Sequence, residues 1–190
     1  MIEINIKNET ALLRAVVVGT ANDFGGTPEI EECYDPKSKE HIQAGSFPNE
    51  KDCVSAMDSL IGVFEKHHVM VYRPSNIKGL NQIFSRDIAF VIEDKLILPN
   101  IIEERRRETE GISYILNQVN ESDKIKMPEG ASVEGGDVML CNDYIFVGYS
   151  EKEDFERYRV ARTNRAGLDF LATTFLNKKV KGLELNKSDN

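Results

Sequence analysis

The fold is decided by residues 137–147, which read DVMLCNDYIFV. Two apolar runs in this stretch are separated by Asn-Asp, a turn dipeptide, so a tight hairpin is predicted. Apolar spacing then predicts a helix from about residue 164 to 175, and residues 179–185 predict a further strand. This region therefore predicts a strand-strand-helix-strand unit.

The same arrangement is predicted fifty residues earlier, where residues 87–90 (DIAF) occupy the place of DVML. Apolar runs at residues 88–92 and 95–98, joined by Glu-Asp, predict a second hairpin. A charged helix is expected from about residue 103, and a short strand at residues 124–127. The core side of that helix is expected to carry Ile112, Ile115, Leu116 and Val119.

The first part of the chain matches this unit less closely. Residues 14–19 (RAVVVG) and 69–72 (VMVY) predict strands. Asn49 is the candidate N-cap of a helix that extends to about residue 67 and has one apolar face. Residues 20–47 contain several Gly and Pro and predict an irregular loop, and a loop of this length is usually functional or mobile.

These patterns together predict an α/β fold with repeated strand-strand-helix-strand units. The three units lie at about residues 11–75, 81–128 and 132–186, within a single domain of residues 1–190. Units of this length bury their faces against neighbouring units, as in propellers and solenoids. The alternative is an ordinary α/β domain whose elements alternate without a repeat.

The composition limits the partners that are expected. Lys and Arg number 24, and Asp and Glu number 32, which gives a formal net charge of −8. Nucleic acids and anionic membranes attract basic patches, so neither is expected as a partner. A negative field mildly favours cationic substrates.

Targeting and cysteine patterns predict a cytoplasmic protein. No apolar run approaches the roughly 20 residues of a membrane helix, and the N-terminus lacks the apolar segment of a signal peptide. The three cysteines fit neither a disulfide framework nor a zinc site, and no spacing indicates another metal or an organic cofactor. Cys33 is expected to be exposed in the loop, Cys53 to face the core from a helix, and Cys141 to be buried in a strand.

Two acidic motifs precede the predicted hairpins, one unit apart. Asp87 ends residues 81–87 (NQIFSRD), and Glu134 begins residues 134–137 (EGGD). Equivalent positions of a repeat array converge on one axis, so the two carboxylates are expected to face one cavity. Carboxylates pair bidentately with guanidinium, so the pair predicts a site for a planar cation. The alternative is that both are turn residues whose side chains cap backbone N–H groups.

A third motif, residues 162–164 (RTN), stands at a predicted helix start that Thr163 could cap. Arg162 at this place could hold a substrate carboxylate. The alternative is a solvated surface arginine, because residues 151–165 are strongly charged.

Three motifs in this order, FSRD, EGGD and RTN, resemble the motif series of arginine deiminases and dimethylargininases. Residues 16–19 and 69–74 (VMVYRP) also resemble the amidinotransferases of the same superfamily. The resemblance extends from about residue 14 to 185. It implies a five-bladed α/β propeller, the pentein fold, of which about three units are present.

The resemblance also implies chemistry at the carbon of a guanidine or amidine group. A Cys thiolate attacks that carbon, a His protonates the departing amine, and water or an acceptor amine resolves the covalent intermediate. Asp87 and Glu134 would grip the guanidinium nitrogens as catalytic residues, and Arg162 would hold the α-carboxylate of an arginine-like substrate. Residues 20–47 would form a lid or rim over the site.

The chain departs from the family pattern at the base and the nucleophile. The family's His follows the third unit and its Cys lies near the C-terminus, and neither has a counterpart before Asn190. The chain is therefore expected to be an inactive front portion of a longer enzyme, or a short relative that completes itself by dimerising. Open strand edges promote association, so a homodimer is a possible partner. None of the three histidines is expected to be the catalytic base: His41, His67 and His68.

The leading functional hypothesis is a guanidino-group hydrolase that acts on arginine or an arginine derivative. Glu134 favours a hydrolase, because glycine-type amidinotransferases tend to carry Asp in a different local motif at this place. An amidinotransferase of the same superfamily stays an alternative. So does a non-catalytic binding protein on the same fold, in which Asp87 and Glu134 are structural caps. The remaining alternative is an acidic α/β domain without a small-molecule site.

Overall fold

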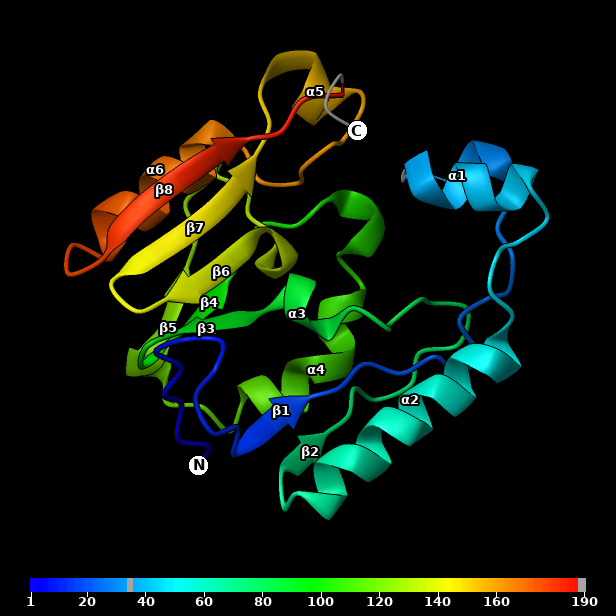
Figure 1. Ribbon diagram of the computed structural model, residues 1–190, viewed down its shortest axis with the longest axis horizontal. Coiled ribbons are helices and arrows are strands. Elements are labelled where there is room, and N and C mark those ends of the chain that lie inside the picture. The colour runs from blue at the N-terminus through cyan, green and yellow to red at the C-terminus, as the bar shows by residue number, and fades with distance from the viewer. Residues whose placement is uncertain (34–35, 188–190) are drawn as a thin grey trace. The chain divides into compact units, whose positions relative to one another are not determined.

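The computed structural model describes residues 1–33 and 36–187 (Figure 1). Residues 34–35, within the predicted loop, and 188–190, at the end of the predicted domain, lie outside the described residues. Helices and strands alternate along the chain, which confirms the α/β class. The described helices include none that is long and apolar enough to cross a membrane.

Contacts divide the chain into two compact parts, which we call the larger part and the smaller part. The larger part comprises residues 1–11, 86–106 and 116 onward. The smaller part comprises residues 12–85 and 107–115.

The first sheet of the larger part has the order β3-β4-β5. β3 (Phe90–Ile92) and β4 (Lys95–Leu98) form the predicted hairpin, and they are antiparallel. β5 (Lys124–Lys126) pairs in parallel with β4. The hairpin turn places Glu93 at a φ of 54°, the left-handed region that tight two-residue turns require.

The second sheet repeats this topology with the order β6-β7-β8 (Figure 1). β6 (Val138–Cys141) and β7 (Tyr144–Tyr149) are antiparallel, and β8 (Lys179–Glu184) pairs in parallel with β7. The second hairpin prediction is therefore also confirmed. Asn142 in its turn has a φ of 52°.

Short helices connect the strands of the larger part. α6 (Arg165–Thr174) packs against β7 and β8, and it carries the buried residues Leu168 and Leu171. The other helical segments are α3 (Ser85–Ile88), α5 (Lys152–Glu156) and the 3-10 turns η2 (Glu103–Arg105), η3 (Glu121–Asp123) and η4 (Gly135–Asp137).

The core of the larger part lies where the inward faces of both sheets meet α6. β7 alternates between buried and partly exposed residues, as a strand with one covered face requires. The most deeply buried side chains of this core are Ile92, Ile97, Val133, Ile145, Val147 and Leu171. Burial of apolar side chains such as these stabilises a fold by about 1.5–3 kcal/mol each.

The smaller part contains β1 (Ala15–Val17) paired in parallel with β2 (Met70–Tyr72). α2 (Glu50–Lys66) precedes β2, and Asn49 is its N-cap as predicted, because Oδ1 of Asn49 accepts from the backbone N–H of Asp52 at 2.9 Å. The predicted apolar face of α2 is half-buried at Val54, Met57, Ile61 and Phe64. The remaining helical segments are η1 (Ile30–Glu32), α1 (Pro36–Gln43) and α4 (Glu108–Leu116).

Three element predictions were wrong in part. The predicted irregular loop contains η1 and α1, and its expected role as a lid stays a prediction. The charged helix does not begin at residue 103: η2 precedes it, and α4 begins at Glu108. Ile88 belongs to α3, so the following strand is shorter than predicted. Ile112, Ile115 and Val119 are buried as predicted, while Leu116 is half-buried.

The cysteine predictions failed at two positions. Cys141 is exposed, because β6 alternates and Cys141 shares the exposed face with Met139. Cys33 is buried directly after η1. Cys53 is half-buried in the first turn of α2.

Candidate functional site

A buried arginine, Arg105, bridges the two predicted carboxylates. It is the last residue of η2, and its side chain is 4% exposed. Its Nη1 donates to Oδ2 of Asp87 at 2.7 Å and to Oε2 of Glu134 at 3.1 Å. A guanidinium group of the chain itself therefore occupies the carboxylate pair.

Glu134 lies at the centre of this ionic cluster. Its side chain is 2% exposed, and its Oε2 also accepts from Nε of Arg162 at 2.5 Å. Among the residues that the structure describes, the other oxygen, Oε1, is buried without a hydrogen-bond partner. Buried carboxylate oxygens normally accept hydrogen bonds, so Oε1 has the capacity for one more N–H donor.

Arg162 is held in place by the segment that leads into α6. Its backbone N–H donates to Oδ2 of Asp137 at 3.2 Å. Burial opposes the charged form of Arg162, but the Glu134 carboxylate more than offsets this effect, so the pKa of Arg162 is raised above its ordinary value. About a quarter of the side chain is exposed. Arg162 is thus a stable cation that neighbours Glu134 and still reaches solvent.

Asp137, the last residue of the EGGD motif, joins this motif to the RTN motif. Its Oδ2 accepts from Oγ1 of Thr163 at 2.8 Å as well as from the backbone of Arg162. Burial raises the pKa of Asp137 to about 6, although the hydrogen bond from Thr163 and the charge of Arg162 act in the opposite direction.

The raised pKa of Asp137 predicts a pH dependence of stability. The carboxyl group of Asp137 binds a proton more tightly in the folded protein than in the unfolded chain, where its pKa is near 3.8. The stabilisation of the fold by this proton is therefore fully present below pH 3.8. It is lost as the pH rises through about 6. Relative to an Asp137→Asn variant, the wild-type protein should lose on the order of 2–3 kcal/mol of unfolding free energy over this window. Urea unfolding of both proteins across the window measures the difference, and parallel pH profiles would contradict the prediction.

The two glycines of the EGGD motif make room for the residues around Asp87. A Cβ on Gly135 would lie 2.1 Å from the carbonyl oxygen of Arg86, and a Cβ on Gly136 would lie 2.5 Å from Oδ1 of Asp87. Real Cβ atoms do not approach other atoms this closely. The Gly-Gly pair therefore allows the carboxylate of Asp87 to lie against the turn that carries Glu134.

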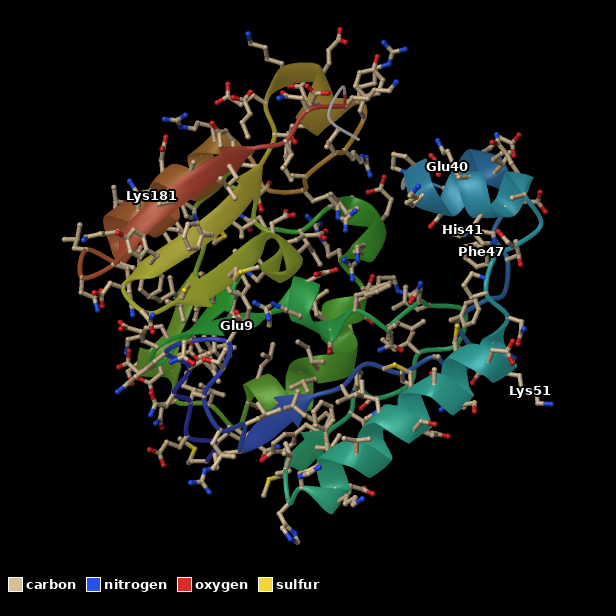
Figure 2. All side chains as sticks on the ribbon, viewed as in Figure 1. Glu9, Glu40, His41, Phe47, Lys51 and Lys181 are labelled. Carbon is tan, nitrogen blue, oxygen red and sulfur yellow. The ribbon has the colours of Figure 1, made fainter. Side chains whose placement is uncertain are left out.

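Arg86 stabilises this turn through hydrogen bonds to its backbone. Its Nε donates to the carbonyl oxygen of Gly135 at 3.0 Å, and its Nη2 donates to that of Val138 at 2.6 Å. The same guanidinium pairs with both carboxylate oxygens of Glu9, which lies on the N-terminal segment (Figure 2). The hydrogen bond from Arg86 lowers the pKa of Glu9. Arg86, the residue before Asp87, thus connects the EGGD turn to the N-terminal segment.

The structure brings all three predicted site residues, Asp87, Glu134 and Arg162, into one cluster of the larger part. The sequence prediction missed Arg105, because the run EERRR at 103–107 does not distinguish a buried arginine from its exposed neighbours. Thr163 does not cap the helix as predicted. Asn164 is the N-cap of α6 and accepts from the backbone N–H of Gly167 at 2.8 Å.

The histidines lie outside this cluster. His41, His67 and His68 are exposed and belong to the smaller part, and Figure 2 shows His41 on α1. Within the described ranges, no three His, Cys, Asp or Glu side chains are grouped to hold a metal ion. A shallow hollow of about 310 Å³ at the start of α6 is lined by residues that include Glu151 and Arg165, but not by the carboxylate pair.

Sequence comparison gives one partial match. No family model matches the chain. Over 96 residues the chain is 32% identical to the uncharacterized protein YkgA of Bacillus subtilis (strain 168). The matched stretch covers 50% of this chain and 33% of YkgA.

Solved structures of guanidine-modifying proteins share the fold. Dimethylarginine dimethylaminohydrolase from Pseudomonas aeruginosa, as a mutant in complex with citrulline, superposes with a TM-score of 0.68 and 17% identity, over 93% of this chain and 63% of that one. An amidinotransferase of the saxitoxin biosynthetic pathway from Microseira wollei gives a TM-score of 0.70 and 16% identity, over 95% of this chain and 62% of that one.

The chain therefore has the fold of the guanidine-modifying superfamily, and the resemblance predicted from the sequence is confirmed at the level of the fold. The chain spans less than two thirds of the length of these proteins.

Proposed function

We propose that the larger part binds the guanidine group of arginine or an arginine derivative, and that the whole protein is a guanidino-group hydrolase. The observation that carries this proposal is the buried Oε1 of Glu134, which lacks a hydrogen-bond partner among the described residues. A guanidine N–H that donates to Oε1 would satisfy this oxygen. A buried acceptor left unsatisfied costs about 1–3 kcal/mol, so a ligand that supplies a donor gains affinity.

The surroundings of Glu134 favour a guanidine over other cations. Asp87 presents a second carboxylate to the same space, and Nη1 of the Arg105 guanidinium donates to both carboxylates. A guanidinium offers several N–H donors in a fixed planar arrangement, so one ligand group can donate to both carboxylates, whereas an ammonium group is a compact point charge. Arg162, which is partly exposed beside Glu134, is suited to pair with the α-carboxylate of an amino-acid ligand.

In the whole protein we expect a thiolate to add to the guanidine carbon and an amine to depart with a proton. Water would then displace the thiol and leave a ureido product. Asp87 and Glu134 would contribute by holding the guanidinium charge and orienting its carbon for attack. The shared topology of the sheets β3-β4-β5 and β6-β7-β8 supports the further proposal that they are blades of a five-bladed α/β propeller.

Binding of L-arginine should depend on Asp87. An Asp87→Asn substitution should weaken binding at least about tenfold, because a hydrogen bond to a charged group contributes about 1.5–3 kcal/mol. Isothermal titration of the wild-type and variant proteins measures this ratio. Asp94→Asn is a matched control, since Asp94 lies in the turn between β3 and β4 and is 72% exposed. Affinity that is unchanged in Asp87→Asn would contradict the assignment of the site.

A non-catalytic guanidine-binding protein is the second candidate. The side chains that donate to the carboxylates of Asp87 and Glu134 are arginines, and among the described residues neither a histidine nor a cysteine bonds to them. Product analysis of the whole protein with L-arginine separates the candidates. Citrulline formation supports the hydrolase, transfer of the amidino group to an added amine supports an amidinotransferase, and binding without either product supports the binding protein.

A further inference from the structure

Thr163, which does not cap α6, lies between the EGGD motif and the RTN motif. The residue is fully buried, with 0% of its surface exposed. Its Oγ1 accepts from the backbone N–H of Glu134 at 3.2 Å and donates to Oδ2 of Asp137 at 2.8 Å. A hydroxyl group has a single proton, so donation to Asp137 leaves its lone pairs for Glu134. The hydroxyl of Thr163 therefore connects the two acidic residues of the EGGD motif.

The backbone around this hydroxyl is also paired. The backbone N–H of Asn164 donates to the carbonyl oxygen of Ser132 at 3.1 Å, and the backbone N–H of Ser132 donates to Oδ1 of Asn164 at 3.0 Å. The carbonyl oxygen of Thr163 accepts from the backbone N–H of Ser150 at 3.0 Å. The segments that carry the EGGD and RTN motifs are therefore joined side by side, so a shift of one moves the other.

Asp137 connects this arrangement to the charged side chains of the site. Its Oδ2 also accepts from the backbone N–H of Arg162 at 3.2 Å, so one carboxylate oxygen receives two donors from the RTN motif. Arg162 in turn donates through Nε to Glu134. A charged acceptor strengthens the hydrogen bonds that it receives, and bonded groups polarise one another. Ionised Asp137 should therefore hold Thr163 and Arg162 more firmly than protonated Asp137.

We propose that Thr163 is a positioning residue of the guanidine site: its hydroxyl, held by the carboxylate of Asp137, fixes the backbone of Glu134 so that Oε1 faces the ligand. This inference rests on the proposed function, because it assumes that the ligand's guanidine donates to Oε1 of Glu134. Thr163 itself does not contact the ligand. Its side chain suits this role because a β-branched residue has restricted rotation about χ1 and Thr163 is excluded from solvent.

Thr163→Val removes the hydroxyl and keeps the shape of the side chain, whereas Thr163→Ser keeps the hydroxyl. Isothermal titration with L-arginine should give an affinity at least about fivefold weaker for Thr163→Val, the loss that corresponds to one hydrogen bond. The affinity of Thr163→Ser should stay close to that of the wild-type protein. Thr173→Val is the matched control and should bind as the wild type does, because Thr173 is exposed on α6 and bonds to the backbone of that helix.

The pH profile of binding supplies a second readout, which a loss of packing alone would not move. The charged groups that act on Asp137 are Arg162 and Glu134, and burial raises the pKa of Asp137 to about 6. A bound cation favours the ionised carboxylate, so the affinity of the wild-type protein should rise with pH and level off above about 6. The hydrogen bond from Thr163 lowers this pKa, so in Thr163→Val the affinity should level off at a higher pH.

The outcomes separate the two proposals. If the wild-type protein binds L-arginine and Asp87→Asn weakens this binding, the guanidine site stands. Thr163→Val with the affinity of the wild type, or with an unmoved pH profile, would then overturn the positioning role alone. Equal losses in Thr163→Val and Thr163→Ser would also overturn it, because packing rather than the hydroxyl would be responsible. If the wild-type protein does not bind L-arginine, both proposals fail.

Asp137→Asn replaces Thr163→Val if the latter does not fold. It keeps an acceptor for Thr163 but removes the charge that strengthens the hydrogen bond. Its affinity for L-arginine should be lower than that of the wild-type protein at about pH 7, and it should not change between about pH 5 and 7. An affinity and a pH profile like those of the wild type would overturn the positioning role.

Discussion

The Glu134→Gln variant should unfold with a free energy about 3 kcal/mol smaller than that of the wild-type protein, because removing one partner of a buried ion pair costs about 3–5 kcal/mol. Gln keeps the shape of the side chain but removes the charge that Oε2 offers to Arg105 and Arg162. Arg105 would keep its bond to Asp87, while Arg162 would lose the negative charge that its Nε faces. The same change should abolish guanidine binding.

Urea unfolding measures the loss in Glu134→Gln, and an unchanged m-value shows that the folded state stays compact. Glu103→Gln is the control, because this carboxylate is 74% exposed and pairs with Arg106 on the surface. Its unfolding midpoint should not change, since surface ion pairs contribute little. A midpoint for Glu134→Gln equal to that of the control would contradict a buried ionic cluster.

Gly135→Ala should cost about 3 kcal/mol of stability, the upper end of the range for an overpacked site. The new Cβ would lie 2.1 Å from the backbone carbonyl oxygen of Arg86 and 3.0 Å from Cβ and Cδ1 of Phe90. Backbone and a core ring cannot rotate away as an exposed side chain can. The turn that carries Glu134 would therefore be pushed away from Arg86.

Thermal unfolding compares this variant with Gly62→Ala. Gly62 lies inside α2, and a Cβ added there would meet no atom within 4 Å, so Ala should raise stability by about 1 kcal/mol. Opposite effects of the same chemical change at the two glycines are the predicted result. A Gly135→Ala protein as stable as the wild type would show that the EGGD turn does not pack against Arg86 in this way.

The sequence predicted the hairpins and the proximity of Asp87 and Glu134 because their signals are local. Each hairpin is two apolar runs around a turn dipeptide, and Asp87 and Glu134 stand at the start of equivalent units. The burial of Arg105 is not local: its partners Asp87 and Glu134 are 18 and 29 residues away. No feature of EERRR distinguishes Arg105 before the chain is folded.

Other misses have similar physical causes. α1 has no buried residue and therefore no apolar face to indicate a helix. β6 reads VMLC, which is apolar throughout, so alternation could not show that Cys141 lies on the exposed face. Thr163 and Asn164 are both good N-caps, and the contact with Asp137 decides which of them turns toward the helix.

A crystal structure of the protein with bound L-arginine would test guanidine binding at Asp87 and Glu134 most directly. We predict that the ligand's guanidine lies beside the two carboxylates and donates to Oε1 of Glu134. A ligand bound elsewhere, with Oε1 of Glu134 still lacking a donor, would contradict the proposed function.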